Sequence, residues 1–204
     1  MEVGVGGADH ARECRGGGLP VTLGGEGLTA LAKTLSLQAL VDALNPHVSG
    51  RLNLVNAGSV AAQRGIDVRQ MAHSVARDRA ESVTVRIDRN GESHEVEGAV
   101  FMDGRPRLLG IDGYRMELVP EGTLVMIFND DRPGVIGLVG TLMGDRGINI
   151  ADLSLSRRGS TALMLLKLDG DLDAKVIEAL QACASILTVR TVQLPYLAKT
   201  STGG

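Results

Sequence analysis

The sequence of 204 residues predicts an α+β fold, in which a domain of helix and antiparallel sheet precedes a domain of β-α-β-β-α-β order. In the first half, Val83, Val85 and Ile87 alternate with polar residues and lead into Asn90-Gly91, a dipeptide typical of two-residue hairpin turns. In the second half, apolar runs of strand length alternate with stretches whose apolar residues recur at helical spacing. This second pattern predicts the ferredoxin-like arrangement.

The first 27 residues contain nine glycines and little apolar content, which predicts a flexible start over residues 1–27. A helix is expected next, because apolar residues recur at i, i+3, i+4 and i+7 until Asn45-Pro46 ends the pattern. These residues are Leu37, Leu40, Val41 and Leu44. Residues 59–64 are expected to form a short helix that stops at Gly65.

Two hairpins are predicted to complete the first domain. The first turns at Asn90-Gly91, and the second turns at Asp112-Gly113 between residues 107–111 and 114–118. Residues 28–118 therefore resemble a helix followed by an antiparallel meander. The break at residues 119–122 marks the expected boundary, which gives a first domain over 28–119.

The second domain is predicted over residues 120–195, with a disordered tail over 196–204. Pro133 stands where the first helical residue is expected, since its fixed φ suits that position, and Gly147 is the expected end of this helix. The expected strands cover residues 123–128, 148–156, 161–168 and 186–194, and a second helix starts at residues 170–173.

Composition narrows the function. Twenty-one Lys and Arg against 24 Asp and Glu give a net charge of −3, which argues against a nucleic-acid partner. The longest apolar runs, such as residues 162–166, are far too short to span a bilayer, so no membrane partner is expected. No N-terminal signal is visible and the two cysteines lie far apart, so a cytoplasmic chain without a disulfide framework is predicted.

No catalytic or metal-binding pattern emerges from the residues. The four histidines are scattered, and neither a nucleophile elbow nor a phosphate loop is present. We therefore expect no catalytic residues, no metal site and no cofactor in this chain.

One loop has the chemistry of a small-molecule site. A helix is expected to open near Pro133-Gly134, and its unpaired N–H groups and dipole would attract a carboxylate. Asp131 could hold an ammonium, Gly134 would permit close approach, and Asn149 could both donate and accept. These are the needs of a free amino acid. The alternative is that Asp131 caps the helix and Asn149 serves a turn.

The loop also resembles a known family. The run Asn129-Asp130-Asp131-Arg132-Pro133-Gly134-Val135-Ile136-Gly137, continued by residues 147–151, is similar to the core of an ACT domain. Residues 54–57 and 61–66 resemble the intervening, or allosteric substrate-binding, domain of long-form D-3-phosphoglycerate dehydrogenase. The resemblance covers about residues 28–194.

The resemblance implies the C-terminal regulatory half of an NAD-dependent oxidoreductase of L-serine biosynthesis. The catalytic half of that family, which binds NAD, has no counterpart here, so the chain is not expected to be an enzyme on its own. A catalytic dehydrogenase half is an implied partner. The implied role is allosteric regulation through L-serine, or another small amino acid, bound between ACT domains paired as a homodimer.

The resemblance also implies site residues. The ligand-binding set is Asn129, Asp131, Pro133, Gly134 and Asn149, with Asn149 contributed by the second subunit. Asn129 stands where some members carry His or Tyr. Arg107 matches a basic residue of an anion site, whose second basic position is Val119 in this sequence. Two alternatives stay open: an assembly module without a ligand, and a regulatory-type subunit of an iron–sulfur L-serine dehydratase.

Overall fold

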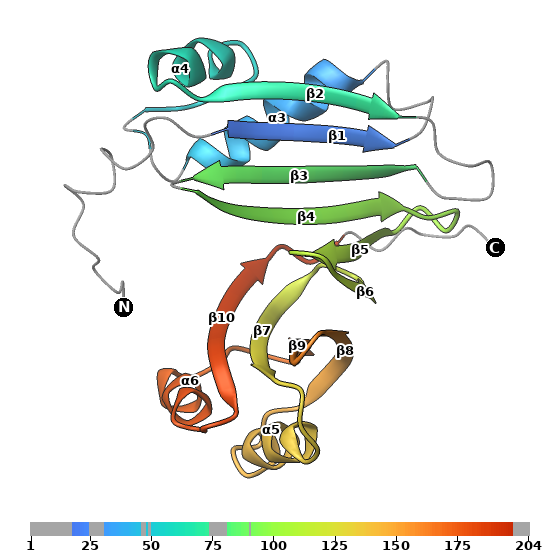
Figure 1. Cartoon of the computed structure of the whole chain (residues 1–204), viewed down its shortest axis with the longest axis vertical. Coiled ribbons are helices and arrows are strands. Elements are labelled where there is room, and N and C mark those ends of the chain that lie inside the picture. Colours follow the sequence, from blue (N-terminus) through green and yellow to red (C-terminus); the bar gives the residue numbers. More distant parts are fainter. Residues whose placement is uncertain are drawn as a thin grey trace. The chain divides into compact units, whose positions relative to one another are not determined.

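The computed structural model describes residues 18–24, 31–45, 48, 50–73, 81–89 and 91–197. The chain forms two compact units, which divide between Val100 and Phe101 (Figure 1). Each unit combines helices with a β-sheet, so the predicted α+β class is confirmed.

In the first unit, two helices pack against a sheet whose strands follow the order β2-β1-β3-β4 (Figure 1). Leu40 and Leu44 of the first helix meet Ala57 and Ala61 of the second in a buried cluster. The elements are β1 (Gly18–Gly24), α3 (Ala32–Leu44), α4 (Ala57–Gln63), β2 (Asp67–His73), β3 (Ser82–Arg89) and β4 (Glu92–Val100). The expected helices and the β3–β4 hairpin are therefore present.

Strand β1 corrects the sequence prediction in two respects. The flexible start expected over residues 1–27 does not extend to Gly18–Gly24, which pair with both β2 and β3. The β1–β2 pair is parallel, so the expected purely antiparallel meander is wrong at this edge. The glycines around this segment hid the signal, although Leu19, Val21 and Leu23 alternate as strand residues do. The rest of the expected flexible start, residues 1–17 and 25–27, lies outside the described residues.

The second unit contains the βαββαβ arrangement that the sequence predicts. Its strands follow the order β10-β7-β9-β8, and all neighbouring pairs are antiparallel. The elements are β5 (Pro106–Ile111), β6 (Tyr114–Leu118), β7 (Gly122–Asp130), α5 (Val135–Gly144), β8 (Ile150–Arg158), β9 (Thr161–Leu168), α6 (Ala174–Gln181) and β10 (Ile186–Leu194). Of the expected tail over 196–204, residues 198–204 lie outside the described residues.

Both faces of the two central strands, β7 and β9, are buried. Met164 and Leu166 of β9 pack with α5 and α6, whereas Leu163 and Leu165 of the same strand pack with the β5–β6 hairpin. Successive side chains of a strand point to opposite faces, so covering both faces requires a continuous apolar run. The run Ala162–Leu166 of β9 is fully buried for this reason.

The β5–β6 hairpin is held to the sheet by polar contacts as well. The Tyr114 hydroxyl lies 2.7 Å from the Thr161 hydroxyl, and the Tyr114 ring meets Phe128 edge to face. At the turn, Nη1 of Arg158 donates to the carbonyl of Asp112 at 2.7 Å. The hairpin therefore packs with the second unit, although the sequence-based boundary at 119–122 falls after it.

Glu121 connects three parts of the second unit. Its carboxylate accepts from Nζ of Lys167 on β9 at 2.7 Å and from the backbone N–H of Leu197 at 3.1 Å. Nη2 of Arg105 lies 4.0 Å from Oε1 of Glu121. The hydrogen bond from Lys167, followed by that from Leu197, holds the pKa of the Glu121 carboxyl below its usual value.

We expect Gly113→Ala to destabilise the second unit more than Gly104→Ala does. Both glycines have left-handed φ, +80° and +72°, which cost an L-residue roughly 1–2 kcal/mol. A Cβ at Gly113 would also lie 2.9 Å from Nη1 of Arg158 and would displace the guanidinium from the Asp112 carbonyl, whereas at Gly104 nothing lies within 4 Å. Urea unfolding of both variants measures the difference. In an Arg158→Ala background the excess should vanish, and an unchanged excess would contradict this account.

We expect Glu121→Gln to lower the free energy of unfolding by about 1–2 kcal/mol at pH 7, because a charged hydrogen bond is lost. A carboxyl whose folded pKa is depressed stabilises the fold above its unfolded pKa, about 4.3 for Glu, and this contribution disappears as pH falls through the folded value. The difference between wild type and variant should therefore shrink below about pH 4.3.

The measurement is urea unfolding of wild type and Glu121→Gln from pH 3 to pH 7. The exposed Glu117, 3.8 Å from Arg107, provides Glu117→Gln as a control with a smaller effect. A difference between wild type and Glu121→Gln that is constant across this range would disprove the assignment.

Candidate functional site

The loop between β7 and α5 carries three of the five predicted ligand-binding residues, Asp131, Pro133 and Gly134. Strand β7 ends at Asp130 and α5 begins at Val135, after Gly134 in a left-handed conformation with φ of +91°. The prediction that Pro133 is the first helical residue is therefore wrong, because the left-handed Gly134 lies between the proline and the helix. This conformation favours glycine, which supports the importance of Gly134 in the loop.

The N-terminus of α5 has no side-chain cap. Gly134 carries no capping group, and the first turn contains no acidic residue. Asp131 does not cap the helix, since no side-chain hydrogen bond caps this end of α5, and its Oδ1 instead lies 3.2 Å from Nε of Arg157. The first N–H groups of α5 and the positive end of its dipole therefore have no anionic side chain of the first turn beside them.

Arg157 is a site residue that the sequence analysis missed. It lies on β8 opposite Ala162 of β9, and Asn129 of β7 lies opposite the same residue on the other side. Two strand spacings, about 10 Å, therefore separate the two backbones, and a long arginine side chain crosses this gap to Asp131. Arg157 is followed by Arg158, and the sequence did not single out either arginine as facing the loop.

A cavity of about 360 Å³ opens at this loop. Its lining combines the acidic Asp131, the basic Arg157 and the apolar Pro133 and Ile136. Arg132 and Gly134 complete it. The structure thus brings together three of the predicted residues, Asp131, Pro133 and Gly134, in a space large enough for a small polar molecule.

Asn129 is buried, and its amide is only half satisfied. Its exposed fraction is 2%, and its Nδ2 donates to the carbonyl of Asp130 at 2.7 Å. Its Oδ1 is buried and accepts no hydrogen bond from any described residue. A buried acceptor without a donor is unfavourable, and a donor that reached it would remove the penalty.

Asn149 lies at the other end of the same sheet. It precedes β8, and its Nδ2 donates to Oδ2 of Asp169 at 2.5 Å. The β9 segment from Thr161, beside the loop, to Leu168, beside Asn149, measures about 23 Å at the usual rise per residue. Within one chain, therefore, Asp131 and Asn149 do not meet. This hydrogen bond joins the residue before β8 to the residue after β9.

Arg107 lies on β5 with its charge already paired. Its Nη2 lies 2.7 Å from Oδ2 of Asp103, and its Nε lies 3.8 Å from Oε1 of Glu117. The guanidinium also lies over the Phe101 ring at 5.5 Å. An anion would have to displace these carboxylates, so the anion site at Arg107 stays a prediction.

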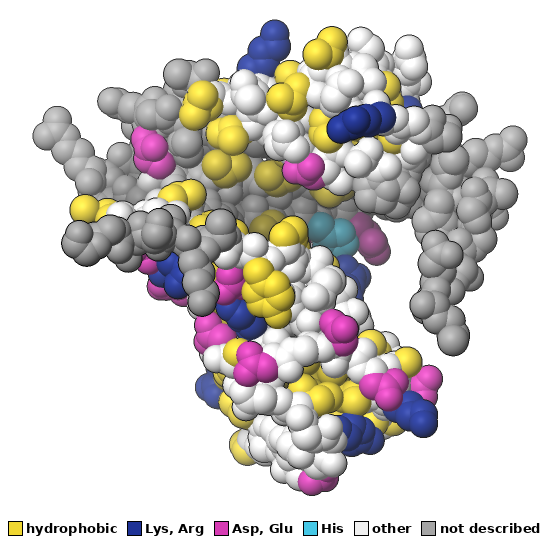
Figure 2. All heavy atoms as spheres, turned by 180° about the vertical axis from the view of Figure 1, so that it is seen from behind, with side chains coloured by type: hydrophobic (Ala, Val, Ile, Leu, Met, Phe, Trp, Pro, Cys, Tyr) yellow, Lys and Arg dark blue, Asp and Glu magenta, His cyan; other side chains and the backbone are white. Residues whose placement is uncertain are grey.

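The described residues offer no other obvious chemistry. Among them, no group of three or more His, Cys, Asp or Glu could hold a metal ion. No described helix is long and apolar enough to cross a membrane. On the face shown in Figure 2, acidic and basic side chains are interspersed, and the described residues form no large patch of one charge there.

Comparison with known proteins matches each part of the chain to a family. The D-3-phosphoglycerate dehydrogenase intervening domain matches residues 18–112, and the ACT domain matches residues 123–185. The first match includes β1, which the sequence analysis missed, and the second includes the cavity loop.

Several proteins named D-3-phosphoglycerate dehydrogenase match most of the chain. The D-3-phosphoglycerate dehydrogenase of Bacillus subtilis is 32% identical over 154 residues, which cover 74% of this chain and 29% of the relative. The enzyme of that name from Methanocaldococcus jannaschii is 33% identical over 168 residues, which cover 81% of this chain and 31% of the relative. The enzyme of that name from Archaeoglobus fulgidus is 32% identical over 178 residues, which cover 85% of this chain and 34% of the relative.

The chain thus spans about a third of the length of the curated relatives it matches. The predicted resemblance is confirmed by two independent domain matches in the expected order. The chain consists of a D-3-phosphoglycerate dehydrogenase intervening domain followed by an ACT domain, and so matches the C-terminal half of that family, as the sequence predicts.

Proposed function

We propose that this chain is the L-serine-sensing and oligomerising portion of a D-3-phosphoglycerate dehydrogenase-type enzyme. The observation that carries the proposal is the cavity of about 360 Å³ at the β7–α5 loop, lined by Asp131, Pro133 and Gly134. These residues belong to the ligand set that the family resemblance implies. The dehydrogenase chemistry and its NAD would reside in a catalytic half, and the assembled enzyme would act in the cytoplasm.

The charges of the cavity suit an amino acid. Asp131 supplies a carboxylate for an ammonium, and the uncapped N-terminus of α5 supplies donors for a carboxylate. The choice of serine among the amino acids comes from the family resemblance, since the buried Asn129 does not line the cavity.

A second copy would complete the site. Asn149 is exposed and lies about 23 Å along β9 from the loop that holds Asp131. A site that uses both residues therefore needs Asn149 from another subunit. Pairing two ACT sheets would also cover exposed strand edges, at which backbone donors and acceptors lack partners within the sheet.

Serine binding would regulate the enzyme by favouring one arrangement of its domains. A ligand shifts such an equilibrium only by its difference in affinity for the two arrangements. One observation favours the alternative of an assembly module without ligand. The Asp131 carboxylate already has a partner, Arg157, in the absence of any ligand. The relatives are named dehydrogenases, which favours a dehydrogenase-type enzyme over the dehydratase alternative.

We expect Asp131→Ala to weaken L-serine binding at least tenfold, and Asp130→Ala to weaken it much less. Loss of a charged hydrogen bond to the ligand corresponds to about ten- to a hundredfold in affinity. Asp130 does not line the cavity, and its Oδ2 lies 3.4 Å from Nη2 of Arg132. Isothermal titration calorimetry on the full chain measures both affinities.

Equal effects of the two substitutions would refute the residue assignment. A folded wild-type dimer that releases no heat at millimolar serine would select the assembly-only alternative.

We expect two non-binding variants to restore each other when mixed. If each site takes Asp131 from one subunit and Asn149 from the other, an Asp131→Ala/Asn149→Ala heterodimer contains one intact site. Random exchange of subunits would then recover about a quarter of the wild-type sites. Calorimetry before and after mixing and co-refolding gives the number of sites. No recovery, from samples that sizing shows to be dimers, would contradict a site shared between Asp131 of one subunit and Asn149 of the other.

A further inference from the structure

We propose that Arg157 is the carboxylate-recognition residue of this site, so that the Asp131–Arg157 ion pair forms the receptor for a zwitterion. The inference rests on the proposed amino-acid binding and goes beyond it by assigning a residue outside the expected ligand set. It identifies the ligand class as free α-amino acids, which carry an ammonium and a carboxylate on one carbon.

The sheet register brings Arg157 to the cavity. Arg157 and Asn129 flank Ala162 on the central strand, and Asp131 follows Asn129 by two residues. Side chains two residues apart on an extended segment point to the same side, so Asp131 lies within reach of the guanidinium. The resulting Nε–Oδ1 distance is 3.2 Å.

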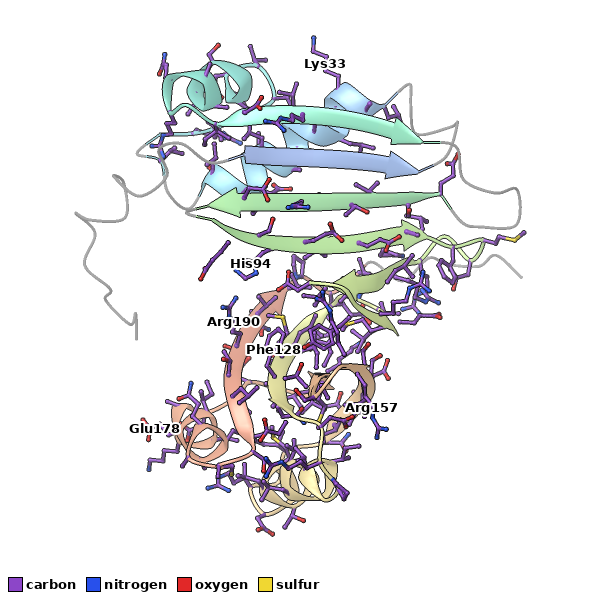
Figure 3. All side chains as sticks on the ribbon, in the orientation of Figure 1. Lys33, His94, Phe128, Arg157, Glu178 and Arg190 are labelled. Carbon is purple, nitrogen blue, oxygen red and sulfur yellow. The ribbon has the colours of Figure 1, made fainter. Side chains whose placement is uncertain are left out.

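Arg157 is held loosely. Its side chain is 68% exposed, and Figure 3 shows it projecting from β8. Its contact to Asp131 is through Nε, and among the described residues it has no second ion-pair partner. An ion pair this exposed contributes little to stability, so a ligand can open it at small cost.

A zwitterion can enter this pair head to tail. Its ammonium replaces the guanidinium beside Asp131, and its carboxylate replaces Asp131 beside Arg157. One ion pair is exchanged for two, and each protein charge keeps an opposite charge as its neighbour. The planar fork of the guanidinium suits a carboxylate, which can accept two parallel hydrogen bonds from it.

The surroundings support this orientation. The uncapped N-terminus of α5 follows Gly134, which lines the cavity together with Arg157, so both favour negative charge there. Ile136 and Pro133 offer apolar surface to the carbon skeleton of the ligand. A ligand with only one of the two charges would leave Asp131 or Arg157 without a partner.

The test compares three ligands on the full chain by calorimetry: L-serine, L-serinamide without the carboxylate, and L-glycerate, which has the same configuration and lacks the ammonium. Arg157→Gln should weaken L-serine about ten- to a hundredfold. It should leave the weaker L-serinamide affinity unchanged or raise it, because the ammonium no longer displaces a guanidinium from Asp131. Asp131→Asn should weaken L-serine and L-serinamide but not L-glycerate. Arg157→Lys, which keeps the charge but not the fork, should fall between wild type and Arg157→Gln.

Arg190→Gln is the matched control. It removes the same charge from an exposed arginine on β10, outside the cavity (Figure 3), and should leave all three affinities unchanged. If Arg157→Gln leaves L-serine binding intact, or weakens L-serinamide equally, the assignment of Arg157 is overturned while amino-acid binding stands. If wild type binds none of the three ligands, the proposed function and this inference both fail.

Discussion

The central strands β7 and β9 are buried on both faces, and the second unit depends on this constraint. One face meets α5 and α6, and the other meets the β5–β6 hairpin. Side chains alternate between the two clusters along each strand, so a register slip of one residue would exchange the two faces. The hairpin is therefore part of this unit's core, although it precedes the break at residues 119–122.

The same register fixes the candidate site. Because β9 lies between β7 and β8, Ala162 has Asn129 on one side and Arg157 on the other. The loop after β7 and the end of β8 thus meet at one end of the sheet, where Gly134 opens α5. The site needs no unusual stability of its own, because paired strands position its two charged groups.

Neighbouring arginines on β8 serve different surfaces. Arg157 contacts Asp131 at the cavity, and Arg158 contacts the Asp112 carbonyl at the hairpin turn. Consecutive strand residues point to opposite faces, which explains why two adjacent, similar side chains have separate partners. One strand end therefore carries both a charge at the cavity and an anchor for the hairpin.

The sequence alone determined the order of elements in the second unit, the two hairpin turns and the loop at Asp131–Gly134, because these depend on local alternation and glycine positions. It did not reveal β1, whose glycine-rich surroundings masked a short alternating run. Nor could it select Arg157 over Arg158, place Asn149 at the far end of the sheet, or show Asn129 buried with an orphaned oxygen. These properties depend on strand register and on which face is covered, and only the tertiary structure decides both.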